Sequence, residues 1–128
     1  LAGYHELLRT LDTLDLVEQV APIQLALRLL IPRGSRLLEL DRERLAVELD
    51  PFDDSRLVYP WRHLDPRVDR LQGIVAGVVG RRLTASRSAV FDELLSLAAE
   101  QVGAPVSPRL VGARDRATVA YLNEPWYC

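Results

Sequence analysis

Three parts of the chain space their apolar residues as amphipathic helices do. In the first part these residues are Tyr4, Leu7, Leu8, Leu11 and Leu14. Steps of about three and four positions place side chains on one face of a helix, so the pattern predicts a helix over residues 3–13. No Ser, Thr, Asp or Asn precedes this helix to cap its first turn.

A second helix is expected to begin at Asp65-Pro66, with Asp65 as the N-cap and Pro66 in the first helical position. Its buried stripe would comprise Val68, Leu71, Val75 and Val78. Gly80 stands where a helix C-cap belongs. Gly73 and Gly77 would let a neighbouring backbone approach the helix closely within a packed core.

The third pattern predicts a helix over residues 88–102. One face of this helix would carry Val90, Leu94 and Leu97. Gly103 and Pro105 are expected to end it, because glycine readily adopts the left-handed C-cap conformation and proline cannot continue a helix. From Pro108 onward the pattern becomes irregular.

The segment between Pro22 and Pro32 is almost entirely apolar. Such a run predicts a buried strand over residues 22–31, although its leucines and alanines also suit a helix. A strand would place Gln24 and Arg28 on one face, where they need polar partners because an unpaired buried cation is very costly. In a barrel that face would point into the lumen, where substrates and cofactors bind. Alternatively, Arg28 is structural and pairs with a core carboxylate.

The middle of the chain carries polar groups but no standard nucleotide-binding or hydrolase motif. Asp41 can cap a short turn, and residues 57–61 are predicted to be extended. The neighbouring acids Asp53 and Asp54 could act in acid/base chemistry, but adjacent acids in a loop are more often a solvated turn. A further group could form part of a site or lie in an ordinary loop, and it comprises Trp61, His63 and Asp65.

Arginine supplies all 16 basic side chains against 18 acidic ones, for a formal net charge of -2. This balance argues against a nucleic-acid partner, which requires clustered surplus cations. The absence of lysine excludes Schiff-base catalysis and a phosphate-loop lysine. The single cysteine, Cys128, and the distant His5 and His63 provide no metal site. No segment approaches the roughly 20 apolar residues of a membrane helix, so we expect no membrane partner and a cytoplasmic location.

Three segments in the same order resemble one protein family. Residues 21–39 read APIQLALRLLIPRGSRLLE and resemble the late barrel region of radical S-adenosylmethionine proteins that carry an N-terminal cobalamin-binding-like domain. Residues 59–71, YPWRHLDPRVDRL, resemble the segment that follows there. The ending LNEPWYC, residues 122–128, is similar to the tail of a subgroup that finishes in Cys-Cys-Ala-Glu-Pro or Cys-Sec-Ala-Glu-Pro.

The resemblance implies an α/β fold, mostly helical in this chain. Residues 1–50 would form the late part of a radical S-adenosylmethionine partial (β/α) barrel, and residues 51–128 a mainly helical C-terminal region. The chain would be the C-terminal part of a larger enzyme and would not be catalytic alone, because it lacks the CxxxCxxC motif that holds the 4Fe-4S cluster. Its partners would be the remainder of the parent barrel and a small-molecule or peptide substrate. The parent would use the iron-sulfur cluster, S-adenosylmethionine and, if the cobalamin-binding-like domain is functional, cobalamin.

By the same resemblance, Gln24 and Arg28 are candidates for facing the cofactor or substrate, and Cys128 is a candidate catalytic tail thiol. The family continues with Cys or selenocysteine after this position. Because selenocysteine is encoded by UGA, a reading frame translated without recoding would end at Cys128, which makes the parent a candidate selenoprotein. The other hypothesis is a small helical interaction or structural module without enzymatic activity.

Overall fold

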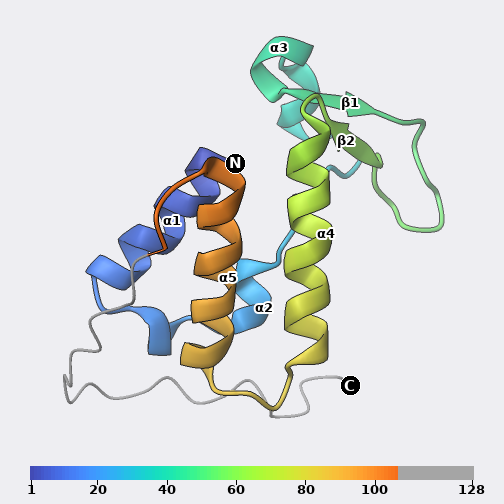
Figure 1. Cartoon of the computed structure of the whole chain (residues 1–128). Coiled ribbons are helices and arrows are strands. Elements are labelled where there is room, and N and C mark those ends of the chain that lie inside the picture. Colours follow the sequence, from blue (N-terminus) through green and yellow to red (C-terminus); the bar gives the residue numbers. More distant parts are fainter. Residues whose placement is uncertain (107–128) are drawn as a thin grey trace. The chain divides into compact units, whose positions relative to one another are not determined.

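The computed structural model describes residues 1–106, apart from the side chains at positions 42 and 43. The fold combines helices with a small two-stranded sheet (Figure 1). At this coarse level the observed fold agrees with the predicted mixed α/β class. The predictions for Cys128 fall outside the described residues. In chain order the elements are α1 (Ala2–Thr13), η1 (Val17–Gln19), α2 (Pro22–Leu25), η2 (Arg36–Glu39), α3 (Arg42–Leu45), β1 (Val47–Leu49), β2 (Trp61–His63), α4 (Pro66–Arg81) and α5 (Arg87–Val102).

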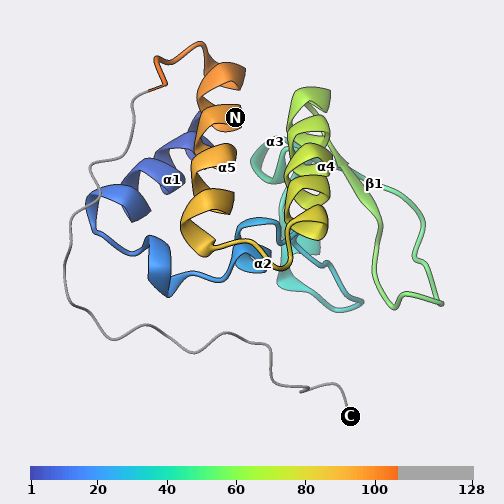
Figure 2. The same cartoon turned by 60° about the horizontal axis from the view of Figure 1, so that its bottom comes forward.

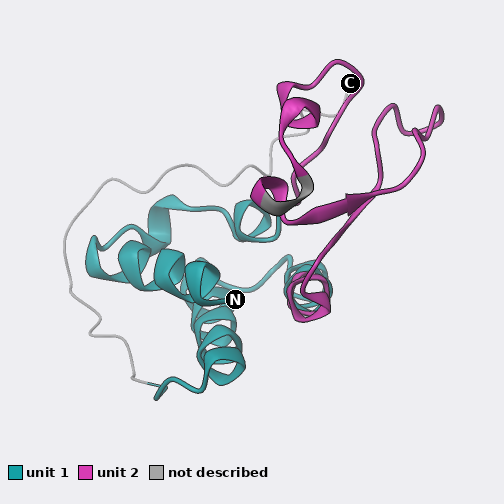
Figure 3. Cartoon of the chain, turned by 90° about the horizontal axis from the view of Figure 1, so that it is seen from above, with its two compact units in different colours: residues 1–27, 73–128 teal, residues 28–72 magenta. Residues whose placement is uncertain are grey.

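The chain divides into two compact units (Figure 3). Of the described residues, unit 1 comprises 1–27 and 73–106, and unit 2 comprises 28–72. The boundary expected at residue 50 therefore falls inside unit 2. Helix α4 begins in unit 2 and ends in unit 1.

Unit 1 is built around α5, which packs against α1, η1 and α2 (Figures 1 and 2). The Ser86 hydroxyl caps the start of the helix by accepting from the backbone N–H of Ala89 at 3.2 Å, and the helix ends at Gly103 as predicted, with φ 66°. The α1 side chain of Leu8 is fully buried. The buried apolar face of α5 comprises Val90, Phe91, Leu94, Leu95, Ala98 and Ala99.

Helix α4 confirms the second predicted helix, but two of its glycine assignments are wrong. The helix continues past Gly80 to Arg81, so Gly80 is not its C-cap. Within residues 1–106, no backbone approaches Gly73 or Gly77: a Cβ at Gly73 would meet nothing within 4 Å, and one at Gly77 would meet the guanidinium of Arg81 at 3.0 Å. The predicted stripe is buried at Leu71, Val75 and Val78 and half-buried at Val68.

The predicted strand over residues 22–31 is wrong. Pro22 instead starts the short helix α2, where its fixed φ suits the first helical position. The Gln24 side-chain oxygen accepts from the backbone N–H of Ala21 at 2.9 Å and satisfies one of the free donors of that helix start. Strand alternation therefore does not apply to Gln24 and Arg28, and the structure gives Gln24 a capping contact.

Unit 2 contains the sheet, in which β1 and β2 run antiparallel with Val47 opposite His63 and Leu49 opposite Trp61. The chain around residue 31 runs beside the segment that leads into β2. There the backbone N–H of Tyr59 donates to the carbonyl of Ile31 at 2.8 Å. This pairing brings the first residues of unit 2 next to residues 58–61.

Candidate functional site

A groove of about 370 Å³ lies within unit 2, between the chain that follows α2 and the segment entering β2. We call it the Arg28 groove. Its apolar wall includes Leu29, Leu30, Val58 and Pro60. Its polar and aromatic lining comprises Arg28, Arg56, Tyr59 and Trp61.

Arg28 is held in place by three contacts. Its Nη2 donates to the carbonyl oxygen of Trp61 at 2.5 Å and forms an ion pair with Asp69 Oδ1 at 2.9 Å. Its Cζ lies 3.9 Å from the centre of the Trp61 ring, within cation–π range. The Trp61 ring is itself fixed, because its Nε1–H donates to the carbonyl of Leu29 at 2.8 Å. The Arg28 side chain is nevertheless 31% exposed.

Asp69 connects Arg28 to the backbone of β2. Its Oδ2 accepts from the backbone N–H of His63 at 2.9 Å, while Oδ1 faces Arg28. Asp69 lies in the first turn of α4, where a carboxylate is also favoured by the helix dipole. The sequence prediction did not include Asp69. The only available signal was an acid near a predicted helix start, which does not identify a partner for a distant arginine.

The tight connection from β2 to α4 depends on His63 and Asp65. The Nδ1 of His63 accepts from the backbone N–H of Asp65 at 2.8 Å. Asp65 in turn caps α4 as predicted, accepting from the backbone N–H of Arg67 at 3.0 Å. The Arg67 side chain, which also hydrogen-bonds this carboxylate, lowers the pKa of Asp65 to about 2. Asp65 is thus a structural carboxylate, whereas Trp61 from the same predicted group lines the groove.

Asp53 occupies a turn beside the groove. Its Oδ1 accepts from the backbone N–H and the hydroxyl of Ser55, at 2.9 and 2.6 Å, and from the backbone N–H of Arg56 at 3.2 Å. The hydroxyl hydrogen bond is the main reason that the pKa of Asp53 lies below its usual value. Its Oδ2 also lies 3.7 Å from Nε of Arg56. These contacts fit the solvated-turn interpretation of Asp53 and Asp54.

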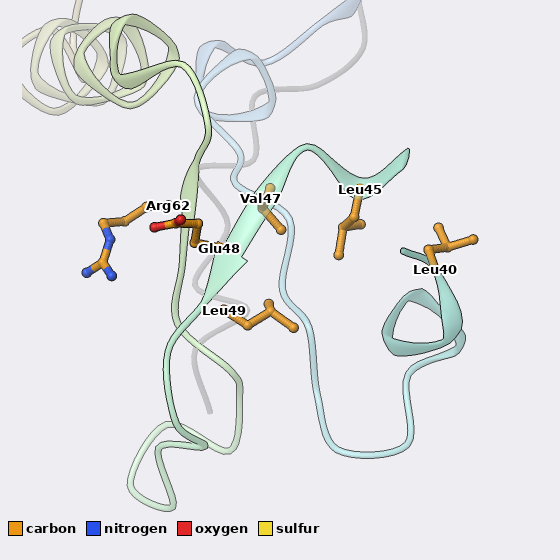
Figure 4. Close-up of a pocket in the computed structure, with 6 residues that line it drawn as sticks. All are labelled: Leu40, Leu45, Val47, Glu48, Leu49 and Arg62. Atoms are coloured by element: carbon orange, nitrogen blue, oxygen red, sulfur yellow. The ribbon is translucent and has the colours of Figure 1, made fainter. Parts of the chain in front are cut away.

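Two other hollows are lined by fewer polar and aromatic side chains than the Arg28 groove. Leu40 and Leu45 face Val47 and Leu49 across a hollow of about 370 Å³ beside β1 (Figure 4). Arg62 extends away from these side chains, and both its terminal nitrogens bind Asp50, at 3.2 and 2.8 Å. A hollow of about 170 Å³ in unit 1 is lined by His5, Arg9, Leu95, Ala99, Ala104, Pro105 and Val106.

Of the residues predicted for a site, Arg28 lies in the groove of unit 2 and Gln24 in α2 of unit 1. Within residues 1–106, no group of three or more His, Cys, Asp or Glu side chains is placed to hold a metal ion. None of the described helices combines the length and apolarity needed to cross a membrane. Comparisons with family models, curated proteins and solved structures find no match.

Proposed function

We propose that this chain is the C-terminal part of a radical S-adenosylmethionine enzyme of the type with an N-terminal cobalamin-binding-like domain. The proposal is supported by the ordered resemblance of residues 21–39, 59–71 and 122–128 to that family. The iron-sulfur cluster and S-adenosylmethionine would be bound by the remainder of the parent barrel, because this chain has no CxxxCxxC motif. Cobalamin, where used, would also be bound there.

One observation in unit 2 carries most weight. Two of the three family-like segments meet at Arg28: the first supplies Arg28 itself, and the second supplies Trp61, which lines the groove with it, and Asp69, which pairs with Arg28 from outside the lining. Residues that carry the resemblance thus build one contact cluster although they are far apart in sequence. In the parent enzyme Arg28 would face the substrate or cofactor from this groove rather than from a barrel strand, because residues 22–31 contain no strand. Cys128 would be the first of two redox-active tail residues.

The decisive experiment is to read the nucleotide sequence on both sides of the coding segment. We expect a CxxxCxxC motif upstream, in the same frame or displaced by a frameshift, and a UGA or Cys codon directly after Cys128. The full-length product should then contain iron and acid-labile sulfide and should cleave S-adenosylmethionine when reduced. An upstream sequence without that motif, including in a neighbouring gene, contradicts the proposal. Any other codon after Cys128 contradicts the redox tail.

The second candidate is a small helical interaction module. It is favoured by unit 1, where α1 and α5 enclose a buried apolar core from their own residues. Expression of the 128-residue chain alone distinguishes the two. A soluble monomer with one cooperative unfolding transition favours the module, whereas a chain that aggregates or stays partly unfolded favours a severed barrel segment.

A further inference from the structure

We propose that the Arg28 groove binds a small monocarboxylate with an apolar body. This inference concerns the groove alone and does not depend on the family assignment. It follows from the charge of the groove, the donors that it leaves available and the composition of its walls.

The charges that line the groove are positive. Arg28 and Arg56 belong to the lining, which contains no acidic side chain among the described residues. Each arginine is paired with an aspartate outside the lining: Asp69 for Arg28 and Asp53 for Arg56. The two pairs together are neutral, so the groove suits a single negative charge better than the double charge of a phosphate.

The guanidinium of Arg28 retains donors for such a ligand. Its contacts with Trp61 and Asp69 both involve Nη2. Across the part of the chain that the structure describes, Nη1 and Nε make no hydrogen bond. The two geometries in which a guanidinium binds both oxygens of a carboxylate, through Nη1 with Nη2 or through Nε with Nη2, each include Nη2, which Trp61 and Asp69 already occupy. A ligand carboxylate would therefore accept single hydrogen bonds from Nη1 or Nε. The contacts with Asp69 and the Trp61 ring orient the guanidinium before a ligand arrives.

The walls favour an apolar body on the ligand. Leu29 and Leu30, which line the groove, are 51% and 69% exposed, so a ligand would remove exposed apolar surface from water. The Tyr59 ring packs edge to face with the Phe52 ring, with ring centres 5.0 Å apart. The volume of about 370 Å³ lies near the lower end of known small-molecule sites, which suits a small ligand.

The test uses three probes on the full chain: 4-phenylbutyrate, its uncharged amide and phenyl phosphate. Binding is followed by NMR at the indole N–H of Trp61 and the methyl groups of Leu29 and Leu30. We expect 4-phenylbutyrate to shift these signals saturably, and the amide to bind at least about tenfold more weakly. Phenyl phosphate should also bind more weakly than the carboxylate. Equal binding of the amide, tighter binding of phenyl phosphate, or no saturable shift at these groups overturns the proposal.

Arg56 and Arg44 provide a matched pair of variants. Their side chains are 76% and 77% exposed, and each lies near an aspartate three positions earlier, at 3.7 and 4.0 Å. Only Arg56 belongs to the groove lining. Arg56→Gln should weaken 4-phenylbutyrate binding by roughly three- to tenfold while leaving the free Trp61 signal in place, and Arg44→Gln should leave binding unchanged. Equal affinities of the two variants contradict the inference. As a second check of the apolar wall, Leu30→Gln should weaken 4-phenylbutyrate binding more than butyrate binding.

Discussion

The partly buried charge of Arg28 is stabilised by contacts with two residues. Asp69 supplies the opposite charge, and the carbonyl and ring of Trp61 supply a hydrogen bond and a cation–π contact. The sequence left two roles open for Arg28, a lumen-facing group or a residue paired with a carboxylate. The structure supplies the carboxylate, and the Arg28 side chain lines the groove with 31% of its surface exposed.

Removing one member of this ion pair should destabilise unit 2. Arg28→Met leaves Asp69 half-buried without its cation, so we expect a loss of about 1–2 kcal/mol in the free energy of unfolding. Trp61 fluorescence during urea unfolding measures it, in a Trp126→Phe background. Arg36→Met is the control, because Arg36 is 93% exposed in a 3.8 Å pair and should contribute little. Additive effects of Arg28→Met and Asp69→Asn would show that the pair is not coupled.

Tyr4 makes the stability of unit 1 sensitive to alkaline pH. Its hydroxyl donates to the carbonyl of Leu25 at 3.1 Å, and burial raises the pKa of Tyr4 to about 12. In the unfolded chain the same hydroxyl ionises near pH 10. The stabilising effect is therefore complete below about pH 10 and is lost as the pH rises towards 12.

Tyr4→Phe tests this pH dependence. The variant should be about 1 kcal/mol less stable at neutral pH because it lacks the hydrogen bond to the Leu25 carbonyl. The difference between the two proteins should shrink between about pH 10 and pH 12, because only the wild-type protein contains the titrating group. Denaturant unfolding at a series of pH values measures the difference. A constant difference up to pH 12 would falsify the assignment.

Among the elements, the long helices could be predicted, and so could the short turn at Asp41, whose carboxylate accepts from the backbone N–H of Arg44 at 2.7 Å, but the short helix α2 could not. Helices α1, α4 and α5 carry apolar residues at helical period over at least three turns. Asp65 and Gly103 mark a helix start and a helix end that are set by local capping interactions.

Helix α2 has four residues, too few for a period to be recognised. Its helical state depends on Pro22 and Gln24 at its start. The partner of Arg28 also escaped prediction, because side-chain contacts between distant segments leave no periodic signal.

Two glycine-to-alanine substitutions should change stability in opposite directions. Gly103 has φ 66°, where an added Cβ is strained, so Gly103→Ala should destabilise the protein by about 1 kcal/mol. Gly73 lies inside α4, and a Cβ there would meet nothing within 4 Å, so Gly73→Ala should stabilise by up to about 1 kcal/mol. Thermal unfolding of the two variants and the wild type measures both effects. Destabilisation by Gly73→Ala would indicate that α4 has a close neighbour at Gly73.

At the scale of the whole molecule, the two units differ in how much apolar core each contains. In unit 1 the described core includes Leu8, Val17, Leu25 and most of one face of α5. The buried apolar residues described in unit 2 are Ile31, Val47 and Leu71. Unit 2 depends more on polar contacts, such as the Arg28–Asp69 pair and the two hydrogen bonds between Arg62 and Asp50.

This difference predicts separate opening of the two units. Regions with few buried apolar contacts open at lower free energy than the global unfolding reaction. In native-state hydrogen exchange with increasing guanidinium, the amides of Val90 and Leu94 in α5 should therefore be the last to exchange. The sheet amides of Asp50 and Leu64, which bind the carbonyls of Pro60 and Ala46, should exchange earlier and with a smaller dependence on denaturant. Exchange of these sheet amides together with those of α5 would mean that the chain unfolds as one cooperative structure, and that the smaller apolar core of unit 2 does not limit its stability.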